Sequence, residues 1–291
     1  MGHTGDDAGI AVIGAAGQTG SAVVRALALR GCDPTALIHS EGQAEAALGA
    51  GAGATRVCDL EDPDSVERSL AGVRAVHLVP PVFRANETRL VANVRDAAAA
   101  AGVRRVVYHS VLHPNTPTMP HHMNKMRAEA ELRDSDLEWT ILQPAMYAQT
   151  VLTYHRRSPA GRLQAPFDVR KTFTLIDLGD IAEIAAAVLL DEVGRYGVYE
   201  LAGPEALTVE QMAAQIGELV GEDITAEHIV PWRLEMPEKI TSRMAYMAAM
   251  CDEYNRRGLV GNADVARMLL GREPTSFAAA AKRELLERSA V

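Results

Sequence analysis

Short apolar runs alternate with helix-like stretches along the first two thirds of the chain. A helix places apolar residues three and four positions apart, whereas a strand buried on both faces reads as a continuous apolar run. Strand, helix and strand at this spacing predict right-handed βαβ units around a parallel sheet. The predicted strands are 9–14, 35–39, 55–59, 75–79, 105–110 and 139–143.

Glycines mark the predicted helix ends. Three helix-like stretches stop at Gly31, Gly72 and Gly102, and glycine is the residue most favoured just beyond a helix C-terminus. The stretch before Gly72 also has an acidic first turn, which suits the positive end of a helix dipole. These signals place the predicted helices between the predicted strands.

The pattern loosens after residue 150. Residues 154–174 are rich in Pro, Gly and charge and predict a loop, whereas 175–191 predict a helix with Asp180 as its cap. A further strand is expected at 197–203. From Thr208 onward the chain reads as mostly helical, opening with a capping-box pattern in which Gln211 follows three residues later.

Composition narrows the classes of function. The formal net charge is −9, which argues against a basic nucleic-acid surface. No apolar run approaches the roughly 20 residues of a membrane span, and the first residues lack a signal-peptide pattern. The cysteines, Cys32, Cys58 and Cys251, are scattered and odd in number, which suits a reducing compartment. We therefore expect a cytoplasmic protein with no membrane or direct nucleic-acid partner.

The stretch GAAGQTG, residues 14–20, follows the first predicted strand and opens the first predicted helix. Gly14, Gly17 and Gly20 recur at every third position, whereas the commoner fingerprint is G-x-G-x-x-G. Three glycines alone indicate only a turn. Between a strand and a helix they favour a phosphate-binding loop, because the backbone can approach a pyrophosphate that the helix N-terminus attracts.

The stretch AVIGAAGQTGSAVVRALALRG resembles the atypical short-chain dehydrogenases/reductases, specifically their NmrA-like branch. Later segments resemble that branch in the same order, among them CDLEDPDSVERSLAGVRAVHLVPP, LEWTILQPAMYAQT and LAGPEALTVEQMAAQIGELVG. The resemblance implies an α/β fold: a Rossmann-type doubly wound parallel sheet with a smaller, mostly helical C-terminal lobe. It places an NAD(P)-binding domain in 1–150, to which 172–202 return, and a substrate-binding lobe in 151–171 and 203–291.

The resemblance also implies which residues bind the cofactor. Asp59 and Leu60 would flank the adenine, and Val79 and Pro80 would pass the nicotinamide ribose. The remaining positions implied in this way are Gly14, Ala16, Gly17, Gln18, Thr19 and Gly20 in the loop, and Pro144, Ala145 and Tyr147 beside the nicotinamide.

The end of the second strand predicts the choice of dinucleotide. An acidic residue there binds the ribose 2′-OH of NAD, and a cationic one suits a 2′-phosphate. His39 stands where NADPH-preferring relatives commonly carry Arg, Ser40 follows, and Glu41 already turns into the next helix. This favours NADP(H), with NAD(H) as the alternative and with His39 as an ordinary strand-end residue as the competing interpretation.

The family pattern also implies the catalytic residues, and this sequence departs from the pattern at one position. Typical short-chain dehydrogenases carry Tyr-x-x-x-Lys on one helix face. Lys125 is present, but His121 replaces the tyrosine. Lys125 would bind the ribose, and His121 would either relay a proton or only begin a helix. Ser110 lies where the family's active-site serine usually falls, or is simply a strand-terminal serine.

Two further groups of residues are candidates for a metal site and for a substrate pocket. His109, His113, His121 and His122 lie close in sequence, but no thiolate or His-Glu-x-x-His pattern accompanies them, so no metal is expected. Met244, Met247 and Met250 recur three apart, as adaptable pocket residues or as core. The expected substrate pocket is Tyr147, Trp232, Met247 and Tyr254.

The sequence predicts an NAD(P)H-dependent reductase that transfers a hydride to a small apolar quinone, enone or carbonyl compound. The missing tyrosine keeps open a non-catalytic redox-sensing regulator, and the same fold also serves isomerases and dehydratases. The expected partner is the small-molecule substrate, with a homodimer or a regulatory protein as the alternatives.

Overall fold

A computed structural model describes residues 9–190, 193–230 and 241–287. The chain forms two compact units. The first unit comprises Met1–Pro114, Asn124–Gln143 and Ile181–Tyr199, and the second comprises Asn115–Met123, Pro144–Asp180 and Glu200–Val291. This division differs from the predicted boundaries in placing 115–123, 144–150, 172–180 and 200–202 in the second unit.

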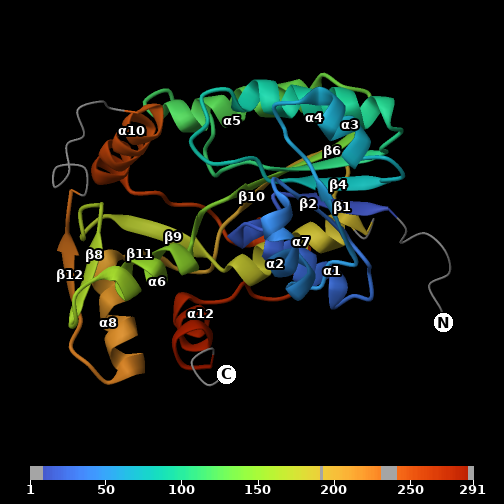
Figure 1. Ribbon diagram of the computed structural model, residues 1–291. Helices are drawn as coiled ribbons and strands as arrows, with labels where there is room; N and C mark the ends of the chain where they lie inside the picture. The colour runs from blue at the N-terminus through green and yellow to red at the C-terminus, as the bar shows by residue number, and fades with distance from the viewer. Residues whose placement is uncertain (1–8, 191–192, 231–240, 288–291) are drawn as a thin grey trace. The chain divides into compact units, whose positions relative to one another are not determined.

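A seven-stranded sheet forms the centre of the first unit, in the order β10-β6-β5-β4-β1-β2-β3 (Figure 1). Its strands are β1 (Ile10–Ile13), β2 (Thr35–Ile38), β3 (Ala54–Val57), β4 (Ala75–Leu78), β5 (Arg105–His109), β6 (Glu138–Pro144) and β10 (Gly197–Leu201). The five pairs among β1–β6 are parallel. The chain winds outward from β1 in both directions, which is the doubly wound order and confirms the predicted fold class.

Helices cover both faces of this sheet. Figure 1 shows α3, α4 and α5 on one face and α1, α2 and α7 on the other. Their bounds are α1 (Gln18–Ala28), α2 (Ala44–Gly49), α3 (Pro63–Ser69), α4 (Glu87–Ala100), α5 (Pro120–Arg133) and α7 (Leu178–Leu189). Gly31, Gly72 and Gly102, where helices were predicted to stop, follow α1, α3 and α4 and all have positive φ. Among the described residues, no helix combines the length and the apolar character needed to cross a membrane.

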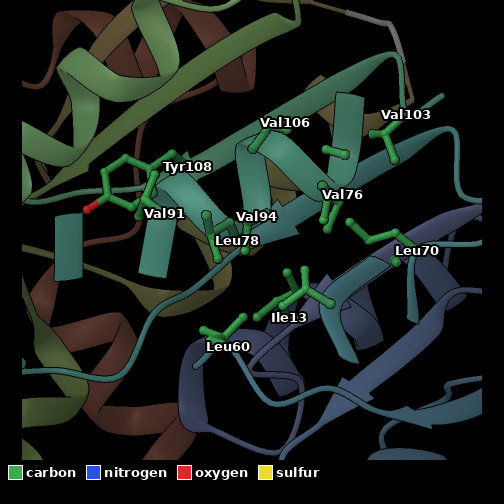
Figure 2. Close-up of a cluster of buried hydrophobic side chains, with 14 of the residues drawn as sticks. Ile13, Leu60, Leu70, Val76, Leu78, Val91, Val94, Val103, Val106 and Tyr108 are labelled. Carbon is green, nitrogen blue, oxygen red and sulfur yellow. The ribbon is translucent and has the colours of Figure 1, made fainter. Parts of the chain in front are cut away.

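One hydrophobic core lies between the sheet and α3, α4 and α5 (Figure 2). Side chains of a strand alternate between faces, so Val106 and Tyr108 of β5 point into this core whereas Arg105 bonds to α7 through the carbonyl of Val188. Both faces of the central strands are therefore buried, as their continuous apolar runs predicted. Other members of the core are Ile13, Leu60, Leu70, Val76, Leu78, Val91, Val94 and Val103.

The second unit contains two small sheets with the strand orders β11-β9-β7 and β12-β8. Its elements are β7 (Met146–Tyr147), α6 (Ala148–Arg157), β8 (Arg162–Ala165), β9 (Thr172–Ile176), β11 (Ala206–Thr208), α8 (Val209–Val220), β12 (Thr225–His228), α10 (Ser242–Arg257), α11 (Asp264–Leu270) and α12 (Phe277–Lys282), followed by a π-helical turn at Arg283–Glu287. The capping box of Thr208 and Gln211 is confirmed at the start of α8.

Two local predictions in this unit are wrong. The segment 154–174 is not a loop, because it contains the end of α6, all of β8 and the start of β9. These strands form through distant partners, as when Arg162 pairs with Thr225, which local composition cannot reveal. Asp180 does not cap a helix from outside. It lies in the first turn of α7, where its carboxylate accepts hydrogen bonds from Arg272 and Thr275.

Candidate functional site

The turn between β1 and α1 is built from close backbone contacts. Gly14 has φ +74°, and a Cβ there would lie 2.6 Å from the carbonyl oxygen of Val79. A Cβ on Gly20 would lie 2.2 Å from the carbonyl oxygen of Gly14. Both positions therefore require glycine to let the helix pack against the strand end. Gly17 differs, because a Cβ there meets only the Gly14 oxygen at 3.2 Å.

The N-terminus of α1 is open to an anion. Gly17 is the N-cap, so no side chain caps the first N–H groups, and the first turn contains no acidic residue. Gly17 and Gln18 are exposed, Ala16 is half-buried, and Thr19 is buried. The positive end of the helix dipole and its N–H groups together attract phosphate. The described turn therefore fits the pyrophosphate of a dinucleotide.

The ends of the neighbouring strands carry the other predicted cofactor residues of the first unit. His39 and Ser40 follow β2 and are exposed, and the backbone N–H of His39 donates to Gln43 Oε1 at 2.9 Å. After β3, the backbone N–H of Asp59 donates to Ser65 Oγ at 3.1 Å.

Leu60 is buried, with its carbonyl accepting from Asn93 Nδ2 at 2.8 Å. Val79, after β4, is half-buried beside Gly14, and Pro80 is buried. These residues follow the carboxyl ends of parallel strands, where ligands of such sheets bind.

Lys125, on α5, is buried and paired. Its Nζ donates to Glu87 Oε1 at 2.7 Å and to the carbonyl oxygen of His109 at 3.1 Å, and it lies 5.3 Å from the centre of the Tyr108 ring. The Tyr108 hydroxyl donates to the same Glu87 oxygen at 2.7 Å. Burial and the adjacent Glu87 carboxylate raise the pKa of Tyr108 well above its ordinary value, so this hydroxyl remains a donor.

Ser110 is held by a second buried carboxylate. Its Oγ donates to Glu129 Oε1 at 2.5 Å, and Gln143 Nε2 donates to that oxygen at 2.7 Å. Burial raises the pKa of Glu129, and these two hydrogen bonds oppose the shift. The sequence prediction missed Glu87, Glu129 and Gln143. Only Glu129 left a signal, since it stands four residues after Lys125 on the same helix face.

The histidines of the predicted cluster lie on different elements. His109 is on β5, where its ring packs edge-on against His77 of β4 at 5.7 Å between centroids. His121 and His122 are buried in the first turn of α5, with their rings 6.0 Å apart. Within the described ranges, no group of three or more His, Cys, Asp or Glu side chains is arranged to hold a metal ion.

The remaining predicted site residues belong to the second unit. Pro144 ends β6, and the backbone N–H of the buried Ala145 donates to the Leu201 carbonyl at 2.8 Å. Tyr147 is half-buried and precedes α6. Met247 is half-buried on α10, and Trp232 lies outside the described residues.

Tyr254 is 4% exposed, and its ring lies 5.7 Å from that of Phe167 and 5.8 Å from that of Phe173. Burial raises the pKa of Tyr254. This is the packing of a core residue, and the pocket role of Tyr254 stays a prediction.

Comparison with known proteins identifies a family that matches this chain, and one of the relatives is named as an NAD(P)H enzyme. Residues 6–279 match the NmrA-like family. Quinone oxidoreductase 2 of Escherichia coli is 29% identical over 225 residues, which cover 76% of this chain and 77% of that protein. NAD(P)H azoreductase of Xenophilus azovorans is 27% identical over 283 residues, covering 94% of this chain and 96% of that protein.

The crystal structure of the Escherichia coli NADPH-dependent quinone oxidoreductase complexed with NADPH superposes with a TM-score of 0.80 at 25% identity. The superposition covers 94% of this chain and 99% of that one. The family match confirms the resemblance that the sequence suggested: the chain belongs to the NmrA-like family.

Proposed function

We propose that the chain is an NAD(P)H-dependent reductase that acts on a small apolar quinone, enone or carbonyl compound. The observation that carries this proposal is the glycine turn, where the N-terminus of α1 has neither a side-chain cap nor an acidic residue. Family membership and the similarity to a quinone oxidoreductase and an azoreductase support a reductase over other uses of the fold.

In this proposal, different residues of the chain bind different parts of the dinucleotide. The backbone of 14–20 binds the pyrophosphate, and the exposed His39 and Ser40 face the 2′-phosphate of the adenosine. NADP(H) is therefore the favoured cofactor, and NAD(H) the alternative. When bound, the nicotinamide supplies the hydride.

Lys125 binds the nicotinamide ribose in this proposal. An ammonium has three N–H donors, and Glu87 and the His109 carbonyl take two of them. The third donor is the one offered to a ribose hydroxyl. His121 and Ser110 are the candidates for contact with the substrate, with Ser110 fixed by Glu129.

The test is NADPH consumption on a panel of quinones, enones and azo dyes, run beside calorimetric titration with NADP+ and NAD+. We expect turnover of at least one apolar quinone or enone and tighter binding of NADP+. Binding of NADP+ at micromolar affinity without turnover of any panel member would contradict the reductase and favour a redox-sensing regulator.

A further inference from the structure

Glu87 is a fully buried carboxylate at the first position of α4. Its Oε1 accepts two hydrogen bonds of 2.7 Å each, from Lys125 Nζ and from the Tyr108 hydroxyl. Within the described part of the chain its Oε2 has no hydrogen-bond partner. One carboxylate oxygen thus joins three elements of the first unit, namely α4, α5 and β5.

This arrangement restricts where the ammonium of Lys125 can lie. The side chain of Lys125 is 7% exposed, and that of Glu87 is 0% exposed. Moving either charge away from the other would leave it unpaired in a buried place, which is strongly unfavourable. The carbonyl of His109 fixes a second N–H of the ammonium. The Tyr108 hydroxyl, in turn, fixes the oxygen to which Lys125 is bonded.

Stability alone does not explain such a pair, because replacing a buried ion pair by apolar residues of similar volume is often neutral or stabilising. We propose that Glu87 is a positioning residue: together with Tyr108, it holds Lys125 Nζ at the carboxyl end of β5. This inference rests on the proposed function, in which Lys125 binds the nicotinamide ribose. Glu87 itself touches neither cofactor nor substrate and acts only through Lys125.

A second ion pair joins the same two helices and provides a matched control. Arg95 of α4 and Glu131 of α5 lie 2.5 Å apart, with 25% and 34% of their side chains exposed. Glu131→Gln therefore removes a link between α4 and α5 without touching Lys125. If Glu87 only tied the two helices together, both glutamine variants would act alike.

The first experiment is a double-mutant cycle on NADPH affinity, measured by calorimetry. Loss of a hydrogen bond to a charged group should make Glu87→Gln bind NADPH about tenfold more weakly, and Glu131→Gln should bind like the parent protein. Lys125→Met should also weaken binding. Because Glu87 acts through Lys125, adding Glu87→Gln to Lys125→Met should weaken binding no further. Additive losses, or parental affinity in Glu87→Gln, would overturn the inference.

The second experiment observes Lys125 without any nucleotide. The chain has only four lysines, Lys125, Lys171, Lys239 and Lys282, so protein labelled with 13Cε-lysine gives a small set of NMR signals, and the one lost in Lys125→Met is that of Lys125. Glu87→Gln should move this signal, and Glu131→Gln should leave it in place.

Tyr108→Phe keeps the ring but removes the hydroxyl, so it should move the Lys125 signal in the same direction as Glu87→Gln by a smaller amount. It also replaces Glu87→Gln as the test should that variant fail to fold. An unmoved Lys125 signal overturns the positioning role. A parent protein that binds no NADPH overturns the proposed function instead.

Discussion

Three glycines that look alike in the sequence have different physical roles. Gly14 and Gly20 permit backbone contacts that any side chain would break, with a Cβ at 2.6 Å and 2.2 Å from a carbonyl oxygen. Gly17 has φ −80° and ψ 167°, values that any residue adopts. A Cβ on Gly17 would lie 3.2 Å from the carbonyl oxygen of Gly14, a contact that a small shift relieves. The fold itself therefore tolerates a side chain here, whereas a bound phosphate would exclude one.

Gly17→Val separates binding from folding. The variant should remain folded, because only one atom lies near the new Cβ, and its NADPH affinity should fall at least about tenfold since the branched side chain takes the space of the phosphate. Gly20→Ala is the control, and overpacking should lower its free energy of unfolding by about 1–3 kcal/mol. Calorimetry and thermal unfolding measure both effects. A folded Gly17→Val protein with parental affinity would refute the phosphate role.

His121→Ala tests whether histidine has taken over the work of the missing tyrosine. Losing general acid–base catalysis typically costs about 100- to 10,000-fold in rate. We expect His121→Ala to lower kcat by less than about tenfold, below that range, because hydride transfer carries the reaction. The measurement is steady-state turnover of the best panel substrate. A 1000-fold loss with NADPH binding intact would show that His121 relays the proton.

At the scale of elements, α5 shows what the sequence could not provide. Lys125 was found by its motif and Glu129 stands on the same face, but both point to polar partners rather than to an apolar core. Glu87 lies 38 residues before Lys125, so only the packing of α4 beside α5 brings the two together. Partners of a buried charge are set by the tertiary structure, and a local pattern does not encode them.

The strands, too, fall into those that the sequence predicted and those that only the structure revealed. The central strands β1, β4 and β5 are fully buried, and burial on both faces leaves the apolar run that predicted them. The edge strand predicted at 55–59 is also confirmed, as β3, although most of its residues are exposed. In contrast, β8 is Arg-Leu-Gln-Ala and β12 is Thr-Ala-Glu-His. Each is partly exposed and carries no such run. Their pairing became visible only in the structure.

The β4–β5 pair contains a buried histidine that should make stability depend on pH. Neither ring nitrogen of His77 has a hydrogen-bond partner in the described part of the chain, and burial lowers the pKa of His77 from 6.5 to about 3. The fold therefore favours the neutral ring. The contribution of the neutral His77 ring to the free energy of unfolding is therefore fully present above the unfolded pKa of about 6.5, and it is lost as the pH falls toward 3.

His77→Leu should remove this dependence. At pH 7 the variant should be as stable as the parent or more stable, because an unpartnered buried polar group is replaced by an apolar one. Between pH 7 and pH 5 the parent should lose about 2 kcal/mol of unfolding free energy that the variant retains. Urea unfolding at the two pH values measures the difference. An equally steep loss in His77→Leu would assign the pH dependence to other groups.

At the scale of the whole molecule, the order of segments carried more information than any single one. The three glycines alone indicate only a turn. The βαβ order that follows them predicted the doubly wound sheet, which the strand order confirms. The family match likewise extends over residues 6–279 and not over the glycine turn alone. The sequence predicts the site residues less completely than it predicts the fold. Motif spacing locates Lys125 and the glycine turn, whereas the carboxylates that hold Lys125 and Ser110 required the structure.

Nucleotide binding should also appear in the stability of the whole chain. A ligand that binds only the folded state at 100 times its Kd adds about 2.7 kcal/mol, which corresponds to a rise in Tm of about 5–10 °C for a unit of this size. NADPH should produce the larger shift and NADH a smaller one at equal concentration. The end of β2 carries His39 and Ser40 rather than a carboxylate for a free ribose 2′-OH, and the adjacent Glu41 already lies in the 3-10 turn that follows. Gly17→Val should show almost no shift with either nucleotide. Thermal unfolding with each nucleotide measures this directly, and an equal or larger shift with NADH would make NAD(H) the cofactor.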